Sequence, residues 1–212
     1  MKNILSIALV IVYLIGLSAC GNQNDKVNKN MYIEPAQLSQ TEEDIGELLG
    51  LNENRMIYDF VLQDGVQTMK KSTYVLADGK WEVLSSEVGE FKDTKGRIAL
   101  GFDYIADGVW TATQSENQKG KTSYKPMEAE DLGNLGVATT KLNDKSEIVY
   151  DKEIPVALQV MTSKNEIYSE SVSGFFEPNK LEEKEYEHVY AITLLFSQKS
   201  NAELEKQTEG NQ

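Results

Sequence analysis

The stretch HVYAITLLF, residues 188–196, decides the fold class. Large apolar side chains stand at every second position, namely Tyr190, Ile192, Leu194 and Phe196. A period of two is typical of a β-strand that buries one face in a hydrophobic core. Val189 and Leu195 place further apolar atoms on the opposite face, so this segment is predicted to be a strand with its main stripe in the core.

The same alternation recurs in three other segments, RMIYDFVLQ (55–63), GRIALGFDY (96–104) and EIPVALQV (153–160). The residues predicted to share one buried side within each segment are Met56, Tyr58, Phe60 and Leu62; Ile98, Leu100, Phe102 and Tyr104; and Ile154, Val156, Leu158 and Val160. About seven to nine short strands separated by turn signals favour an antiparallel sandwich or barrel. The prediction is a mainly β, antiparallel β-sandwich-like single domain with one short N-terminal helix.

Two Asp-Gly pairs, Asp78-Gly79 and Asp107-Gly108, predict tight hairpin turns. Such pairs supply the positive φ angles that two-residue hairpin loops require. The first turn would place Leu76 opposite Trp81, and Tyr74 opposite Val83, on one face. The second would place Ile105 opposite Trp110 and turn Trp110 away from the Ile98-to-Tyr104 stripe. Trp110 is therefore the aromatic residue predicted to be partly exposed and available for binding, unless a one-residue bulge reverses its direction.

A helix is predicted over residues 41–49. Ser39 with Glu42, and Thr41 with Asp44, match the capping box, in which side chains satisfy the first backbone N–H groups. Gly50 supplies a stop. The apolar stripe expected to pack on the body of the protein consists of Ile45, Leu48 and Leu49.

Composition and chain organisation narrow the range of functions. The chain carries 34 acidic against 21 basic side chains and a formal charge of −13, which disfavours nucleic acid and anionic lipid head groups as partners. The predicted organisation is a signal segment at 1–19, a flexible tether at 20–36, the β-sandwich-like domain at 37–199 and a disordered tail at 200–212. Residues 115–146 read as long loops around at most one weak strand.

The N-terminus predicts export. Residues 4–17 form an uncharged apolar run of a length typical of a signal-peptide core, shorter than the roughly 20 residues that span a bilayer. Leu17-Ser18-Ala19-Cys20 resembles the bacterial lipobox. That resemblance implies that diacylglycerol is attached to the thiol of Cys20 and that the chain is cut just before it. An ordinary signal peptide with an incidental cysteine and an uncleaved anchor are the alternatives.

Lipidation of Cys20 would place the protein on the extracytoplasmic face of the cell membrane. Two acyl chains give durable anchoring where one gives only marginal binding. Cys20 is the only cysteine, so its modification leaves no thiol for a disulfide or a nucleophile. The membrane, reached through the lipid on Cys20, is thus a predicted partner.

Motifs for catalysis are absent from the sequence. His188 is the single histidine, and its neighbours Glu185 and Glu187 should project from the other side of a regular strand, which disfavours a metal site. The sequence has no nucleophile elbow, phosphate loop or calcium loop. We expect no cofactor, no metal and no enzyme, although carboxylate pairs of a hydrolase could converge in the fold.

The C-terminal segments EIVYDKEIPVALQVMTSKNEIYSESVSGFFEP (147–178) and EHVYAITLLFSQKS (187–200) resemble uncharacterised lipoproteins of low-GC Gram-positive bacteria. The resemblance implies location rather than activity. The leading hypothesis is a ligand- or protein-binding module, with Trp110 as the candidate binding surface for a carbohydrate or a cell-envelope protein. The alternatives are a structural or assembly accessory of the envelope without a small-molecule ligand, and a carboxylate-dependent hydrolase.

Overall fold

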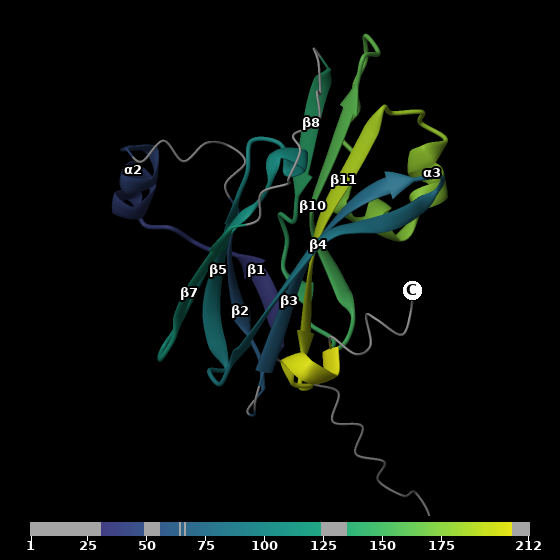
Figure 1. Cartoon of the computed structure of the whole chain (residues 1–212). Helices are drawn as coiled ribbons and strands as arrows, with labels where there is room; N and C mark the ends of the chain where they lie inside the picture. The colour runs from purple at the N-terminus through teal and green to yellow at the C-terminus, as the bar shows by residue number, and fades with distance from the viewer. Residues whose placement is uncertain (1–30, 49–55, 64, 66, 124–134, 205–212) are drawn as a thin grey trace, which may run out of the picture.

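The computed structural model describes residues 31–48, 56–63, 65, 67–123 and 135–204 and shows two antiparallel sheets (Figure 1). The six-stranded sheet has the order β7 (Lys119–Ser123), β6 (Trp110–Ser115), β5 (Lys95–Gly101), β2 (Met56–Val61), β1 (Tyr32–Pro35) and β9 (Ser146–Glu147). The five-stranded sheet has the order β4 (Lys80–Phe91), β3 (Gln67–Ala77), β11 (His188–Ser197), β10 (Glu153–Thr162) and β8 (Gly136–Lys141). The predicted mainly β, sandwich-like fold is confirmed.

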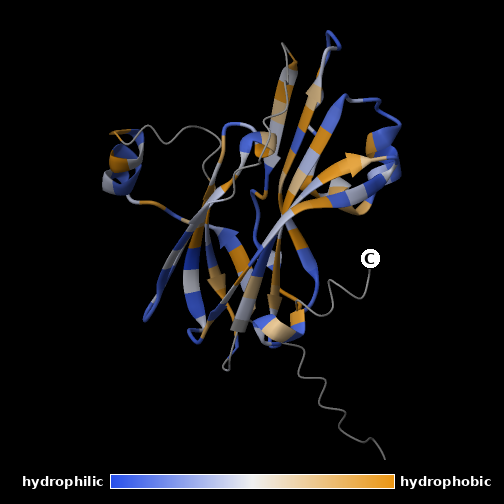
Figure 2. Cartoon of the chain, in the orientation of Figure 1, coloured by the Kyte–Doolittle hydropathy of each residue, from blue (hydrophilic) through white to orange (hydrophobic). Residues whose placement is uncertain are grey.

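The main core lies between the two sheets and follows the predicted alternation. Buried side chains of β2, β5 and β11 meet there, and on β11 all four residues of the predicted stripe are at most 1% exposed. The hydroxyl of Tyr58 on β2 donates to the carbonyl oxygen of Val156 on β10 at 3.2 Å, linking one sheet to the other. Figure 2 shows hydrophobic residues along β10 and β11 and hydrophilic residues along β7.

A second core covers the outer face of the five-stranded sheet. The short helices η2 (Val172–Phe176) and α3 (Pro178–Glu182) pack there on Tyr74, Leu158 and Val189. Trp81 stacks on Phe175 with ring centroids 5.1 Å apart, and its indole N–H donates to the Phe175 carbonyl oxygen at 2.7 Å. The central strands of this sheet are therefore buried on both faces.

A β-bulge corrects the prediction for residues 153–160. One extra residue shifts the register between Pro155 and Ala157. The alternation of side chains is therefore reversed beyond this point. Ile154 and Val156 face the main core, whereas Leu158 and Val160 face the second core.

The first predicted hairpin is confirmed. Asp78 and Gly79 have φ angles of 48° and 70°, and Leu76 pairs with Trp81 and Tyr74 with Val83. Val83, however, is 51% exposed and does not join the second core.

The second predicted hairpin is wrong. A 3₁₀ helix, η1 (Ile105–Asp107), stands between β5 and β6, and Trp110 pairs with Gly101 rather than Ile105. Gln159 on β10 explains the longer connection, because its side-chain oxygen accepts a hydrogen bond from the Ile105 N–H at 2.9 Å. Burial of Ile105 and Val109 adds to that anchor. Tyr104, predicted to lie in the core stripe, is 39% exposed because β5 ends at Gly101.

The predicted helix is present as α2 (Gln40–Leu48), and the predicted capping box of Ser39 with Glu42 is confirmed. A carboxylate oxygen of Glu42 accepts from the N–H and the hydroxyl of Ser39, both at 2.8 Å. The predicted packing of its apolar stripe is wrong, because Ile45 is 54% exposed and Leu48 is 90% exposed. The helix stands apart from the sheets in Figure 1, and Glu42 contacts Arg97 of β5 through a 3.4 Å ion pair. Leu49 and Gly50 lie outside the described residues.

The domain is longer than predicted at both ends. Strand β1 lies inside the predicted tether at 20–36, and its Ile33 is fully buried, so the domain includes at least Met31 onwards. Residues 201–204 form a helical turn in which Leu204 is buried. The signal segment at 1–19 and Cys20 lie outside the described residues. No helix within the described parts of the chain is long and apolar enough to cross a membrane.

The segment 115–146 is richer in strands than predicted. It contains β7 and β8 and the start of β9, where at most one weak strand was expected. Strand β7, with the sequence KGKTS, was not predicted because all five of its residues are exposed. Its sequence therefore has no alternation of apolar and polar residues.

Candidate functional site

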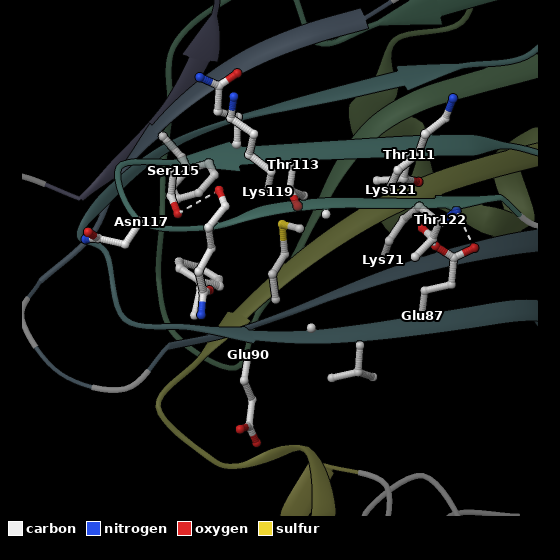
Figure 3. A pocket seen from close by; sticks show the side chains of 18 residues that line it. Lys71, Glu87, Glu90, Thr111, Thr113, Ser115, Asn117, Lys119, Lys121 and Thr122 are labelled. Carbon is white, nitrogen blue, oxygen red and sulfur yellow. Dashed lines mark hydrogen bonds and ion pairs between the residues drawn. The ribbon is translucent and has the colours of Figure 1, made fainter.

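A cleft of about 550 Å³ opens between the β3–β4 edge of the five-stranded sheet and the β6–β7 edge of the six-stranded sheet (Figure 3). β4 and β7 are edge strands of their sheets, whereas the Tyr58–Val156 link joins the sheets through β2 and β10. The volume is within the range of roughly 300–1,000 Å³ that is typical of small-molecule sites. The cleft is the candidate functional site.

Two glycines line the cleft, and one of them, Gly89, leaves open space at its mouth. Gly89 on β4 shares the inward face with Glu87 and Phe91, and a Cβ added to it would meet nothing within 4 Å. Gly120 on β7 pairs with Thr113, and a Cβ there would lie 2.8 Å from the Thr113 hydroxyl oxygen. Neither glycine has a positive φ, so backbone conformation does not require them. Glycine inside a strand weakens it and often marks a bulge, a tight bend or the close approach of a ligand or another backbone.

One end of the cleft is apolar. Phe60 of β2, Met69 of β3 and Phe91 of β4 line it, and the rings of Phe60 and Phe91 lie with centroids 5.6 Å apart. Phe60 also packs on Phe196 of β11 at 5.3 Å, so this end continues the main core. The apolar end offers a surface that gains free energy when a nonpolar group covers it.

The other end carries a buried charge pair. Lys71 of β3 is 1% exposed, and its ammonium donates to Glu87 Oε1 at 3.0 Å. Glu87 Oε2 accepts from the hydroxyl of Thr122 on β7 at 2.5 Å, so the pair also joins the two sheets. Burial lowers the pKa of the Lys71 ammonium, and Glu87 offsets only part of that effect.

Lys71 has donors to spare. Within the described part of the chain, Glu87 Oε1 is the acceptor for its ammonium, which carries three N–H donors. Both oxygens of Glu87 are already engaged, one by Lys71 and one by Thr122. Within the described residues, two N–H groups of the Lys71 ammonium are therefore left without an acceptor.

A threonine hydroxyl beside this end also lacks a partner. Thr111 of β6 lines the cleft and is 5% exposed, and its Oγ1 has no hydrogen-bond partner among the described residues. Thr73 and Ser85 form the next inward-facing pair of β3 and β4 after Lys71 and Glu87. Their buried hydroxyls also lack a hydrogen-bond partner among the described residues. Buried polar groups are normally satisfied, so each such hydroxyl calls for a water or a ligand.

The far end of the mouth is held by Asp93, in the connection between β4 and β5. Its carboxylate accepts from the Ser115 hydroxyl at 2.5 Å and from the backbone and side-chain N–H groups of Asn117 at 3.0 and 2.6 Å. These bonds lower the pKa of Asp93. The cleft thus has a cross-link at each end, Glu87–Thr122 and Asp93–Asn117.

Trp110, the predicted binding residue, does not line the cleft. It lies on the outer face of the six-stranded sheet, half-buried, with its ring across Gly101, where a Cβ would come within 2.2 Å of Trp110 Cε2. Its predicted direction, away from Ile98 and Leu100, is confirmed although the turn that suggested it is not.

The acidic group around His188 does not assemble. His188 stacks on Tyr190 with centroids 6.0 Å apart, Glu187 bonds to Ser163, and Glu185 pairs with Lys164. Across the described residues, no group of three or more His, Cys, Asp or Glu side chains is placed to hold a metal ion.

The cleft does not bring together the carboxylate pair that a hydrolase would need. Its described lining contains Glu87 and Glu90. Glu90 points away from the cleft in Figure 3 and accepts from the Asn201 N–H at 2.7 Å.

The cleft residues were missed by sequence reasoning, although some signals were present. Lys71 stands at an inward position of a strand whose neighbours Met69 and Thr73 are buried, which is unusual for lysine. Gly89 interrupts the strand segment EVGEF without a turn signal. Neither signal shows that β4 and β7 face each other.

Searches against protein-family models, curated proteins and solved structures found no match to this chain.

Proposed function

We propose that the protein is a binding protein whose ligand occupies the cleft between the β3–β4 and β6–β7 edges. The observation that carries the proposal concerns two groups that line the cleft, the buried Lys71 ammonium and the Thr111 hydroxyl. Among the described residues, the ammonium has unused donors and the hydroxyl has no partner. Leaving such groups unsatisfied costs about 1–3 kcal/mol each. A ligand that accepts their hydrogen bonds would recover that free energy.

The alternative of an envelope accessory without a small-molecule ligand explains this region less well. An apolar filling of the same space would stabilise the sandwich, and replacing a buried ion pair by apolar residues is often neutral or stabilising. The cleft instead keeps two glycines at its mouth and polar groups inside. A solvent-accessible cleft with this lining favours binding.

The proposal includes a membrane tether. The lipobox-like Leu17-Ser18-Ala19-Cys20 and the polar residues that follow support a lipid on Cys20 and an extracytoplasmic location. Because β1 begins at Tyr32, the chain between Cys20 and the domain is about ten residues long, which in a flexible coil gives a reach of roughly 20 Å. The domain would then sample its ligand close to the membrane surface.

The cleft is tested with 8-anilinonaphthalene-1-sulfonate, whose fluorescence rises in apolar sites. Gly89→Leu should fill the mouth and remove saturable binding, because its side chain enters free space on the inward face. Gly89→Ala, which adds only a Cβ in open space, is the matched control and should bind as the unaltered protein does. Equal binding by Gly89→Leu and the unaltered protein would refute the proposal.

The tether is tested by Cys20→Ser. This change should abolish incorporation of labelled fatty acid and leave the precursor uncut, because the thiol that receives the lipid is gone. Mass spectrometry of the unaltered protein should show a lipidated N-terminal cysteine. Normal processing of Cys20→Ser, or a free thiol together with a retained Met1, would refute the anchor.

A further inference from the structure

We propose that the ligand of the cleft is an amphiphile with a carboxylate head group and an apolar chain. The head would lie against Lys71 and Thr111, and the chain against Phe60, Met69 and Phe91. This inference rests on the proposed binding function and assigns the chemical class of the ligand.

The head group follows from the balance of donors and acceptors at the Lys71 end. The Lys71 ammonium has unused N–H donors, and Thr111 adds a hydroxyl that no described group engages. The neighbouring acceptor, Glu87, has both oxygens occupied. A group that only accepts satisfies the free donors, and a carboxylate accepts at two oxygens. Its charged hydrogen bonds to the ammonium have to outweigh repulsion from the Glu87 carboxylate, which lies 3.0 Å from Lys71 Nζ.

The apolar chain of the ligand is inferred from the opposite end of the cleft. Strand register separates the two regions: Lys71 pairs with Glu87 and Thr111 with Thr122, whereas Met69 pairs with Gly89 and lies toward Phe91. Figure 3 shows Lys71, Glu87, Thr111 and Thr122 gathered on one side of the cleft, and Ser115 and Asn117 on the other. An amphiphile lying along the cleft would therefore meet polar atoms at one end and aromatic and thioether surface at the other.

The cross-links at the mouth disfavour a peptide strand as the occupant. A peptide added to the free edge of β4 would run along that strand and form main-chain hydrogen bonds with it. Glu87 reaches across to Thr122, and Asp93 reaches Asn117, so a continuous strand between β4 and β7 would have to break both contacts. A compact ligand of small-molecule size enters between them without doing so.

The test compares three probes with one eight-carbon chain and different head groups: octanoate, octan-1-ol and octyltrimethylammonium. Binding to the full-length lipidated protein in nanodiscs is measured by calorimetry, with the Gly89→Leu protein in identical discs as the baseline for partition into lipid. We expect octanoate to bind at least tenfold more tightly than octan-1-ol, because its carboxylate forms a charge-assisted hydrogen bond with the ammonium. Octyltrimethylammonium should bind weakest because it offers no acceptor.

Variants of the head-group end sharpen the test. Lys71→Met should reduce octanoate affinity about tenfold or more and leave octan-1-ol affinity within twofold. The double variant Lys71→Met with Glu87→Gln removes both charges, so it keeps the test valid if the single variant unfolds, and it should show the same loss. Thr111→Val should lower octanoate affinity by severalfold without loss of folding.

The outcomes separate this inference from the proposed function. Equal affinities for octanoate and octan-1-ol, or octanoate binding unaffected by Lys71→Met, would overturn the carboxylate assignment while Gly89→Leu still abolishes dye binding. A peptide that binds in place of all three probes and is blocked by Gly89→Leu would also overturn it and keep the cleft as a binding site. Dye binding that Gly89→Leu does not affect would overturn both.

Discussion

The two halves of the space between the sheets are built in opposite ways. In the closed half, β1 and β2 of one sheet meet β10 and β11 of the other through apolar side chains such as Ile33 and Leu194, which are fully buried. In the cleft half, β6 and β7 approach β3 and β4 through Lys71, Glu87 and Thr122. The same strand alternation thus provides a packed core at one side of the sandwich and a lined cavity at the other.

The difference shows how binding capacity costs stability. Buried nonpolar area contributes about 25 cal/mol per Å², and the closed half receives that contribution in full. The cleft half buries an ammonium and hydroxyls without complete hydrogen bonding, which is unfavourable until a ligand supplies acceptors. Residues of the closed half should therefore govern folding, and residues of the cleft half should govern binding.

The largest effect is expected in the closed half. Leu194→Ala should lower the free energy of unfolding by about 2–5 kcal/mol, because it removes a fully buried side chain and leaves a cavity. Urea denaturation measures the loss. Leu195→Ala, at a half-buried position on the opposite face of the same strand, is the control and should cost less. A loss below 1 kcal/mol for Leu194→Ala would contradict the distinction between the halves.

The next effect is expected at the charge pair. Lys71→Met should lower the free energy of unfolding by about 1–3 kcal/mol, since Glu87 is left partly buried without its cation. Adding Glu87→Gln should recover most of the loss, because the uncompensated charge is then gone. The two single variants and the double variant together give the coupling energy. Losses that simply add would show that the pair does not act as a unit.

Trp110→Ala tests whether the outer face of the six-stranded sheet contributes to binding in the cleft, which lies on its inner face. Trp110 neighbours Thr111 on β6 but lies on the outer face, half-buried over Gly101. The change should cost about 1 kcal/mol in thermal or urea unfolding, below the 3–5 kcal/mol of a core aromatic. It should leave binding to the cleft unchanged. A loss near 4 kcal/mol, or weaker dye binding, would make the outer face part of the same unit.

The smallest effect is expected at Thr111. Thr111→Val replaces an unpartnered buried hydroxyl by a methyl group of similar shape, so stability should stay equal or rise by up to about 1 kcal/mol. Octanoate affinity should fall in the same protein. This opposite change in stability and binding is the signature of a group kept for a ligand. A destabilisation above 1 kcal/mol would show that the hydroxyl serves the fold instead.

Much of the fold was predictable from local alternation. The main-core sides of β2 and β11 follow directly from the period of two, as at Tyr58 and Ile192. The Asp78-Gly79 turn and the Ser39–Glu42 cap also follow from local chemistry, because positive φ angles and unpaired N–H groups are properties of a few adjacent residues.

Two of the predictions that failed depended on contacts distant in the sequence, and a third failed for lack of a local pattern. The bulge after Pro155 sends Leu158 to the second core, and that core exists only because residues 172–182 return to cover the sheet. The connection through Ile105 is longer than a hairpin because Gln159, far along the chain, binds its backbone. Strand β7 was missed because its residues are all exposed, so no alternation marks it.

By itself, the sequence determined which segments become strands and which of their faces are apolar, because pleating makes side-chain direction a local property. It also carries the lipobox-like signal at Cys20 on which the proposed anchor depends. The tertiary structure alone decided that Lys71, Thr111 and Gly89 meet in one cleft. These residues come from strands of two separate sheets, so their proximity depends on the distance between the edges of those sheets. No run of neighbouring residues encodes that distance.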